Sequence, residues 1–343
     1  MDSITATALV IGDCVYLGGA LNRVHEDLPA ARRDPLASHF SGIGFVNEGL
    51  DYNPIIFDFL FEQSWRAEPV DLDGWVRDYA RRVHGAANAD SEAAWAILKD
   101  TAFTGQHQVA PAYMLTPSLV AAVGPPYRNE RLAQAWKQLL GAAKTAGASD
   151  AFQFDLVMIT RQVLGNYSAE VHREAIDAWR ARDGARFQTA SQRMLDLIRD
   201  LDELLATRSE YLLGRWLSDA RRWGKNPDEQ DRLEWNARRV ITMWGQQSLI
   251  RDYSRREWSG MLNGFYLKRW DKFFVALAST LAAEGSFDPA AFDRELQDWE
   301  RRWADQHEKY PVRPRGDSLT VSRRLWTKYE PRLTKSFKPE SRN

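Results

Sequence analysis

The sequence predicts a mainly α protein in which a small α/β segment precedes a large all-helical domain. Two observations lead to this fold class. In the first seventy residues, apolar runs with strand character alternate with stretches that can form helices, as in a parallel sheet or a barrel. From Asp71 onward, apolar residues recur at helical spacing with no convincing strand. We therefore expect a domain boundary near residue 70, between segments 1–70 and 71–343.

Four elements are expected in the first segment. Strand character covers residues 6–18 and 41–47, and the polar stretch 23–39 between them can hold a short helix. After the second strand, Asn53 is a candidate N-cap for a helix over residues 54–65, which begins with a proline. Seventy residues of this alternation are too few to close a barrel.

Helices separated by glycine- or proline-rich breaks are expected over the rest of the chain. They cover residues 74–84, 92–103, 129–146, 151–164, 169–182, 186–205, 210–223, 227–244, 250–284, 289–307 and 319–332. No fixed repeat period is visible, so a regular solenoid is not expected.

The composition excludes several classes of function. The 343 residues carry 46 Lys and Arg against 47 Asp and Glu, which argues against a protein that binds nucleic acid by neutralising phosphates. No apolar run approaches the roughly 20 residues that a membrane-spanning helix needs. Cys14 is the only cysteine and the six histidines form no ligand pair, so no disulfide framework, metal or other cofactor is expected. The first residues lack the features of a signal peptide, which predicts a soluble chain.

The first candidate for chemistry is a carboxylate at the end of the second predicted strand. Glu48 lies in the segment Gly-Ile-Gly-Phe-Val-Asn-Glu-Gly at 42–49. Catalytic groups of α/β barrels lie at the carboxyl ends of strands, and flanking glycines let a ligand approach the backbone. Glycine–acid pairs at strand ends are common, so on this pattern alone a solvated turn residue is the favoured interpretation.

The second candidate is an aromatic pair around a polar loop. Trp244 is expected to end one helix and Tyr253 to lie early in the next, with two glutamines between them. An indole face packs on the apolar face of a pyranose while amides and hydroxyls bind its rim, which suits a sugar pocket. Composition alone favours the alternative that both rings are core anchors, as most of the 14 tryptophans must be. His107, in the polar loop 105–108, is a further candidate, although an ordinary surface residue is the commoner case.

Several segments, in order along almost the whole chain, carry a family resemblance. They are Leu17–Gly19, GIGFVNEGLDYNP at 42–54 with its helix to Trp65, Phe154–Val157, Thr160–Gln162, Tyr211–Leu217, ITMWGQQSLIRDYSRREWSGMLNGFYLKRW at 241–270, Arg315–Asp317, and Trp326 with Lys328 and Tyr329. On these segments the chain resembles the C-terminal part of the α-N-acetylglucosaminidases, glycoside hydrolases that remove terminal α-linked N-acetylglucosamine. The block at 241–270 is long enough to be specific, whereas the short glutamate segment is not.

The resemblance implies a fold and the roles of five residues. The family has a small N-terminal domain, a (β/α)8 barrel and an all-helical C-terminal domain, with the active site between barrel and helices. This chain is then an incomplete piece of the (β/α)8 barrel, its closing segment, followed by the all-α domain. Glu48 matches the catalytic nucleophile. Trp244, Ile250 and Tyr253 match pocket-lining positions, and His107 matches a pocket histidine.

The resemblance leaves three hypotheses of function. Retaining hydrolysis needs a second carboxyl group about 5–5.5 Å from the nucleophile, and the family's acid/base glutamate lies earlier in the barrel, in sequence that this chain does not contain. The first hypothesis is a retaining exo-α-N-acetylglucosaminidase that acts on a glycan containing N-acetylglucosamine, needs an upstream barrel fragment, and is inactive as an isolated chain. The second is an inactive fragment serving as a helical carbohydrate-binding or scaffold domain, and the third is an unrelated helical interaction protein. Neither nucleic acid nor membrane is an expected partner, and the family implies a secreted, periplasmic or lysosomal setting.

The unfinished barrel also predicts poor solubility. Residues 1–70 are expected to expose unpaired strand edges and an apolar face, which favour aggregation. A chain that begins near Pro69 is therefore expected to be more soluble than the whole chain.

Overall fold

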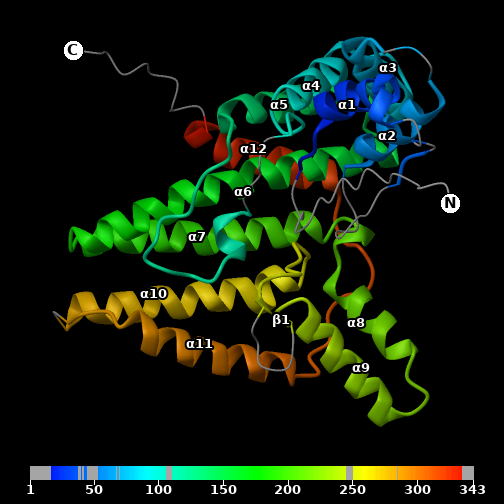
Figure 1. Cartoon of the computed structure of the whole chain (residues 1–343). Helices are drawn as coiled ribbons and strands as arrows, with labels where there is room; N and C mark the ends of the chain where they lie inside the picture. The colour runs from blue at the N-terminus through cyan, green and yellow to red at the C-terminus, as the bar shows by residue number, and fades with distance from the viewer. Residues whose placement is uncertain are drawn as a thin grey trace, which may run out of the picture. The chain divides into compact units, whose positions relative to one another are not determined.

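A computed structural model describes residues 17–37, 40, 42–44, 53–66, 68, 70–105, 110–244, 250–283 and 285–333. This part of the chain is mainly helical, as Figure 1 shows, so the predicted fold class is confirmed. The predicted strands 6–18 and 41–47 fall largely outside the described residues, and the described parts, 17–18 and 42–44, form no strand. Within the same ranges, none of the helices is both long and apolar enough to cross a membrane.

The elements follow one another along the chain with short connections. The α-helices are α1 (Leu21–Arg33), α2 (Pro54–Trp65), α3 (Leu72–His84), α4 (Ala89–Lys99), α5 (Asn129–Ala146), α6 (Asp150–Arg180), α7 (Gly184–Leu205), α8 (Leu213–Arg222), α9 (Pro227–Val240), α10 (Leu267–Ala282), α11 (Pro289–Ala304) and α12 (Ser318–Leu333). Short 3₁₀ turns are η1 (Pro35–Ala37), η2 (Ala112–Met114) and η3 (Ser209–Tyr211), and η4 (Leu262–Tyr266) is a π-helix that leads into α10. The strands β1 (Met243–Trp244) and β2 (Ile250–Arg251) form a two-stranded sheet.

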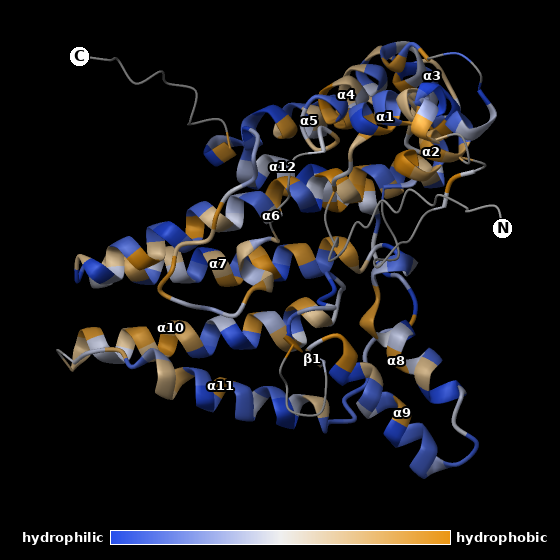
Figure 2. Ribbon diagram, viewed as in Figure 1, coloured by the Kyte–Doolittle hydropathy of each residue, from blue (hydrophilic) through white to orange (hydrophobic). Residues whose placement is uncertain are grey.

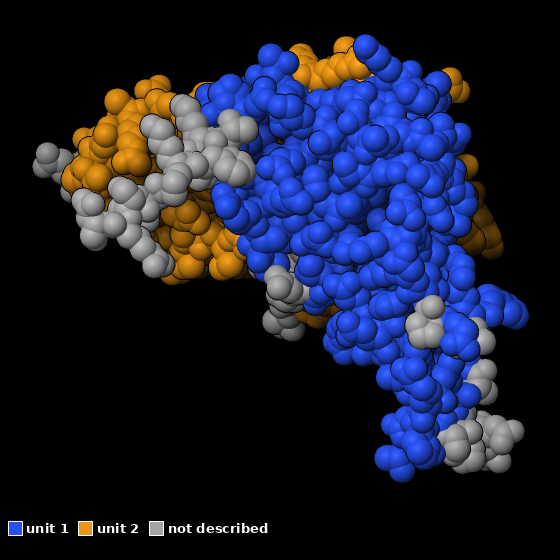
Figure 3. All heavy atoms as spheres, turned by 90° about the horizontal axis from the view of Figure 1, so that it is seen from above, with its two compact units in different colours: residues 1–108, 125–163, 326–343 blue, residues 109–124, 164–325 orange. Residues whose placement is uncertain are grey.

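The chain divides into two compact units, which Figure 3 shows in different colours. Unit 1 comprises residues 1–108, 125–163 and 326–343, and unit 2 comprises 109–124 and 164–325. The domain boundary expected near residue 70 stays a prediction.

Apolar side chains of α1 and α2 form part of the core of unit 1. The apolar side chains of α2 pack on α3, where the rings of Phe59 and Trp75 lie 4.7 Å apart. The indole N–H of Trp75 donates to Glu62 of α2 at 2.7 Å. The amide of Leu21, at the start of α1, donates to the carbonyl of Phe103 at 3.1 Å. These contacts join the first helices to the rest of unit 1 through both apolar packing and hydrogen bonds.

Asn53 does not cap α2 in the predicted way. Its backbone is left-handed, with a φ of 53°, and its side chain makes no capping hydrogen bond. The side-chain oxygen accepts a hydrogen bond from the amide of Gly18 at 3.2 Å instead. Pro54 does occupy the first turn, where its missing N–H costs no hydrogen bond. The side chain predicted to begin the helix therefore joins it to the segment that precedes α1.

Two predicted helices, 151–164 and 169–182, are one continuous helix, α6. Gly165 follows the predicted end of the first of these helices at residue 164, but it lies inside α6. A Cβ atom there would stand 2.9 Å from Cγ of Pro111, so glycine lets the segment before η2 approach the helix closely. The glycine thus permits a contact between segments that are far apart in the sequence, and no local pattern predicts such a contact.

Unit 2 is built around an aromatic core. The rings of Trp270 and Phe274 on α10 lie 5.4 Å apart, and Phe274 also meets Phe187 of α7 at 6.0 Å. By contrast, α9 is hydrophilic along most of its length, as Figure 2 shows. A buried charge attaches α9 to the segment that follows α11. Arg238 of α9 donates to Glu234 of the same helix and, at 2.7 Å, to the carbonyl of Glu308.

His172 on α6 predicts a pH dependence of stability. Its buried ring bonds the carbonyl of Ser118 through Nε2 at 2.9 Å and accepts from the amide of Ala122 through Nδ1 at 3.3 Å, which requires the neutral form. Burial, with a contribution from Arg173, lowers the pKa of His172 below its ordinary value, although the bond to Ser118 opposes this. The folded state therefore binds fewer protons than the unfolded state as the pH falls below about 6.5.

We expect the free energy of unfolding to decrease below that pH, by at most about 1.4 kcal/mol per pH unit from this group. In His172→Gln, whose amide does not titrate, the decrease between pH 7.5 and 5 is expected to be smaller. Urea midpoints at pH 7.5, 6 and 5 measure it. Equal pH dependence in the two proteins would rule out His172 as a source.

Candidate functional site

The predicted aromatic pair lies on a β-hairpin, not on two helix ends. β1 and β2 are antiparallel, with Met243 opposite Arg251 and Trp244 opposite Ile250. The predicted helices 227–244 and 250–284 are therefore wrong at this junction, because α9 ends at Val240 and α10 begins only after η4. Two residues per strand give too little alternation for a strand to be recognised in the sequence.

Three of the predicted site residues come together on this hairpin. Trp244, Ile250 and Tyr253 are 42%, 49% and 40% exposed, so none of them is a core anchor. The rings of Trp244 and Tyr253 lie 5.0 Å apart and are tilted by 53°. The hairpin thus presents a partly exposed apolar surface with two aromatic rings, which is chemically suited to the face of a sugar.

The other two predicted site residues, Glu48 and His107, lie outside the described residues. Their proposed roles therefore rest on sequence. The described neighbours that follow Glu48 are Asn53 and α2, which belong to unit 1.

A buried ion-pair network lies beneath the hairpin. Asp252, between β2 and Tyr253, is 6% exposed, and Arg269 of α10 is fully buried. The two terminal nitrogens of Arg269 donate to the two carboxylate oxygens of Asp252 at 2.9 and 2.8 Å. Thr116 bridges the pair, because its hydroxyl accepts from Arg269 at 2.7 Å and donates to Asp252 at 2.9 Å. Both oxygens of this carboxylate are therefore fixed in position.

The network continues onto α11. Glu300, which is fully buried, accepts two hydrogen bonds from Arg251 of β2, at 2.7 and 2.8 Å. Nε of Arg269 forms an ion pair with Glu300 over 2.9 Å. Arg251 also donates to Asp293, which lies on the same face of α11 as Glu300. The hairpin is thus tied to α10 and α11 by alternating charges.

The charges settle the protonation state of Asp252. Burial acts to raise the pKa of Asp252, but the charge and hydrogen bonds of Arg269, with help from Thr116 and Arg251, outweigh it and hold the pKa below its ordinary value. The carboxylate is therefore ionised at neutral and mildly acidic pH. Its two oxygens accept three hydrogen bonds within the network, which makes it a structural anion and not a general base.

Arg269 and its partners are not among the site residues predicted from the sequence. A usable signal existed, since Arg269 lies four residues after Phe265 and four before Phe273, on the apolar face of its helix. An arginine on such a face requires a buried anion. The acidic partners, Asp252 and Glu300, are 17 and 31 positions away, which the sequence alone does not connect.

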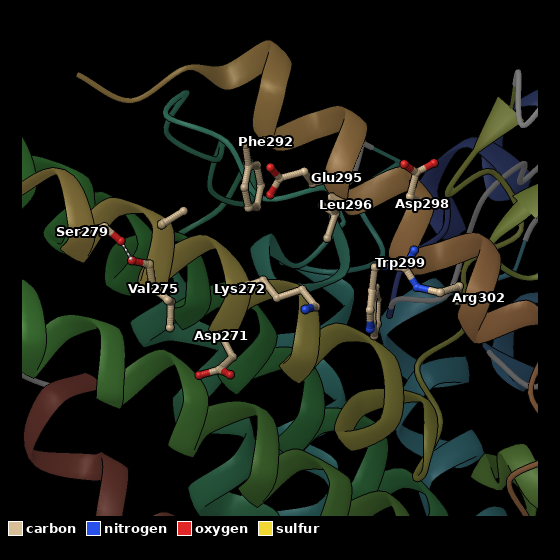
Figure 4. A pocket seen from close by; sticks show the side chains of 11 residues that line it. Asp271, Lys272, Val275, Ser279, Phe292, Glu295, Leu296, Asp298, Trp299 and Arg302 are labelled. Carbon is tan, nitrogen blue, oxygen red and sulfur yellow. Dashed lines mark hydrogen bonds between the residues drawn. The ribbon is translucent and has the colours of Figure 1, made fainter. Parts of the chain in front are cut away.

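A separate groove of about 790 Å³ runs between α10 and α11 (Figure 4). Lys272 of α10 and Trp299 of α11 meet there, with the ammonium 5.7 Å from the centre of the indole ring. The residues of the hairpin do not line this groove. Among the described residues, no cluster of His, Cys, Asp or Glu is arranged to hold a metal ion.

Comparison with known families identifies the class of protein. The family model of the alpha-N-acetylglucosaminidase (NAGLU) C-terminal domain matches residues 75–328, and that of the NAGLU tim-barrel domain matches residues 6–67. Both models describe parts of one class of glycoside hydrolase. The chain belongs to the α-N-acetylglucosaminidase family.

Individual relatives agree with this assignment. The chain is 32% identical to human alpha-N-acetylglucosaminidase over 324 residues, which cover 92% of this chain and 43% of the human protein. A solved family 89 glycoside hydrolase from Clostridium perfringens, in complex with 2-acetamido-1,2-dideoxynojirmycin, superposes with a TM-score of 0.86 at 25% identity, over 96% of this chain and 39% of that chain. A variant of the C. perfringens protein, in complex with its substrate GlcNAc-alpha-1,4-galactose, has a TM-score of 0.85 at 24% identity, over the same shares of the two chains. The chain thus spans less than half the length of these relatives.

Proposed function

We propose that this chain is part of an exo-acting, retaining α-N-acetylglucosaminidase that hydrolyses terminal α-linked N-acetylglucosamine. The observation that carries the proposal is the exposed pair of rings on the hairpin, at positions 244 and 253, in a chain that belongs to this family. The human relative and the C. perfringens enzyme support the reaction class. Residues 1–70 are, in this proposal, the closing segment of the barrel, and residues 71–343 the all-α domain.

Each site residue has a proposed role. Glu48 attacks the anomeric carbon and forms a glycosyl-enzyme, which water then hydrolyses. Trp244 stacks on the sugar, Tyr253 contacts its hydroxyls, and Ile250 completes the apolar wall. His107 binds the rim of the sugar. In this scheme the acid/base carboxyl group comes from an upstream part of the barrel, so the isolated chain has little or no activity of its own.

A non-catalytic function is the alternative. The exposed rings of Trp244 and Tyr253 alone suit a helical carbohydrate-binding or scaffold domain, because stacking on a sugar needs no carboxylate. The secreted, periplasmic or lysosomal setting that the family implies stays a prediction under either proposal.

An assay with a chromogenic α-N-acetylglucosaminide separates the two proposals. We expect no turnover by the chain alone, turnover after addition of an upstream barrel polypeptide from a relative, and α-N-acetylglucosamine as the first-formed anomer by NMR. A β-anomer would contradict retention. Absence of turnover in every combination, with sugar binding that Trp244→Ala abolishes, would favour the binding domain.

A further inference from the structure

The hairpin that carries the proposed sugar contacts is too short to hold its own conformation. Its strands pair over two residues each, and even longer isolated hairpins are marginal in water. The orientation of the Trp244 and Tyr253 rings must therefore be fixed by contacts from elsewhere in the chain. The buried charges beneath the hairpin supply such contacts.

We propose that Arg269 is a positioning residue for sugar binding. Through Asp252 and its neighbours it fixes the backbone of the hairpin, and the backbone in turn sets the rings of Trp244 and Tyr253. The identity of the sugar rests on the proposed function above, whereas the positioning step does not.

The backbone at Asp252 explains why this residue controls the hairpin. Its φ is 59°, a left-handed conformation that costs a non-glycine residue roughly 1 kcal/mol or more and persists only where surrounding contacts enforce it. Its amide donates to the carbonyl of Thr242 at 2.9 Å, next to the first strand. Tyr253 follows directly and Trp244 lies two residues beyond Thr242. A change in the backbone at Asp252 therefore moves both rings.

The fork of Arg269 enforces this conformation. Two parallel hydrogen bonds to one carboxylate fix its rotation as well as its distance, which a single ammonium does not do. Arg269 and Glu300 are fully buried, so solvent does not screen their charges. Glu300 holds Arg251 and Arg269 together. Arg251 of the strand and Asp252 of the turn are thus held by one connected pair of side chains, Glu300 and Arg269. The ring of Phe265 packs against the guanidinium of Arg269, 4.9 Å away.

Amide hydrogen exchange of Arg269→Lys tests the positioning directly. Lysine keeps the charge but loses the fork, so the described amides of the hairpin, at residues 242–244 and 250–252, are expected to exchange at least about tenfold faster, which corresponds to about 1.4 kcal/mol of local opening. Amides of α7 are expected to keep their protection. The matched control is Arg301→Lys on α11, where the arginine is half-exposed and pairs with Asp298. The control is expected to change neither segment.

Unchanged exchange in the hairpin of Arg269→Lys would overturn the proposal. Loss of protection in α7 as well would instead indicate that Arg269→Lys destabilises the fold in general. Thr116→Val then distinguishes positioning from destabilisation, because it removes only the hydroxyl that bridges Arg269 and Asp252. Faster exchange confined to the hairpin of Thr116→Val supports positioning. No local effect in Thr116→Val overturns it.

Sugar binding tests whether the positioning acts through the rings. With 2-acetamido-1,2-dideoxynojirmycin as the probe in calorimetry, Trp244→Ala and Arg269→Lys are each expected to weaken binding about tenfold. The double variant is expected to lose less affinity than the sum of the two single losses, because only the part of the Arg269 effect that acts through Tyr253 remains once the indole is gone. Fully additive losses would overturn action through Trp244. Failure of the unaltered chain to bind the probe would count against the proposed function, and the exchange experiment would still decide the positioning.

Discussion

Replacing Glu48 by glutamine is expected to lower the hydrolysis of a chromogenic α-N-acetylglucosaminide by at least about 10³-fold in a preparation that turns over. An amide has nearly the shape of the carboxylate but is too weak a nucleophile to form the glycosyl-enzyme, and removal of a nucleophile costs several orders of magnitude. The loss is expected in kcat, with the affinity for the sugar nearly unchanged. Glu26→Gln, at an exposed position on α1, is the matched control and is expected to keep full activity.

Azide identifies which of the two carboxylates Glu48 is. In Glu48→Ala the space of the nucleophile admits azide, which attacks from the same face and gives a β-glycosyl azide. An acid/base residue replaced in the same way would leave the glycosyl-enzyme to be opened by azide, which gives the α-product. The anomeric configuration of the azide, read by NMR, is thus decisive. An α-azide, or unchanged activity in Glu48→Gln, would contradict the nucleophile assignment.

The helices were predictable where local signals agree. For α5 the predicted and observed ranges are the same, 129–146, because apolar spacing and a glycine stop point to one answer. Local signals failed where a distant residue decides the conformation. Gly165 lies between two predicted helices, yet it is inside α6, where it allows close contact with Pro111. Asn53 is a predicted cap, but its side chain accepts a hydrogen bond from the amide of Gly18.

The site shows the same division between local and distant causes. Trp244 lies on a strand and not at the end of a helix, and the hairpin is not predicted because each strand pairs over only two residues. Its charged contacts come from Arg269 and Glu300, which are distant in the sequence. The chemistry of Glu48 came from family resemblance, since its local pattern alone favoured an ordinary turn. A two-residue strand held by buried charge has almost no signature in its own sequence.

Removing residues 1–68 is expected to make the chain less soluble, which is the opposite of the expectation from sequence. From the sequence alone, the first segment is expected to be an exposed remnant of a barrel. In the structure, the apolar faces of its described helices are buried within unit 1. The residues it contributes to the core are Leu17, Leu21, Val24, Leu28, Ile55, Ile56, Phe59 and Leu60. Deletion would uncover Trp75 and leave the carbonyl of Phe103 without its partner.

The size of the effect follows from core substitutions. Truncating one buried leucine or isoleucine costs about 2–5 kcal/mol, and a whole domain is stable by only about 5–15 kcal/mol. Losing six such side chains together with Val24 and Phe59 therefore exceeds the stability available to unit 1. A chain that begins at Pro69 is expected to give a lower soluble yield and stronger binding of the dye ANS, which reports exposed apolar surface. An equally soluble chain without dye binding would instead support an independent helical domain that begins near residue 71.

Two phenylalanines on one helix test the packing without a deletion. Phe59 is fully buried against Trp75, whereas Phe61, two residues along α2, is 45% exposed. Phe59→Ala is expected to lower the free energy of unfolding by about 3–5 kcal/mol, because it opens a cavity in the core of unit 1. Phe61→Ala is expected to stay within about 0.5 kcal/mol of the unaltered chain, as for other surface positions. Equal urea midpoints for the two variants would show that α2 does not pack on α3, and the truncated chain would then be expected to fold as the sequence alone predicts.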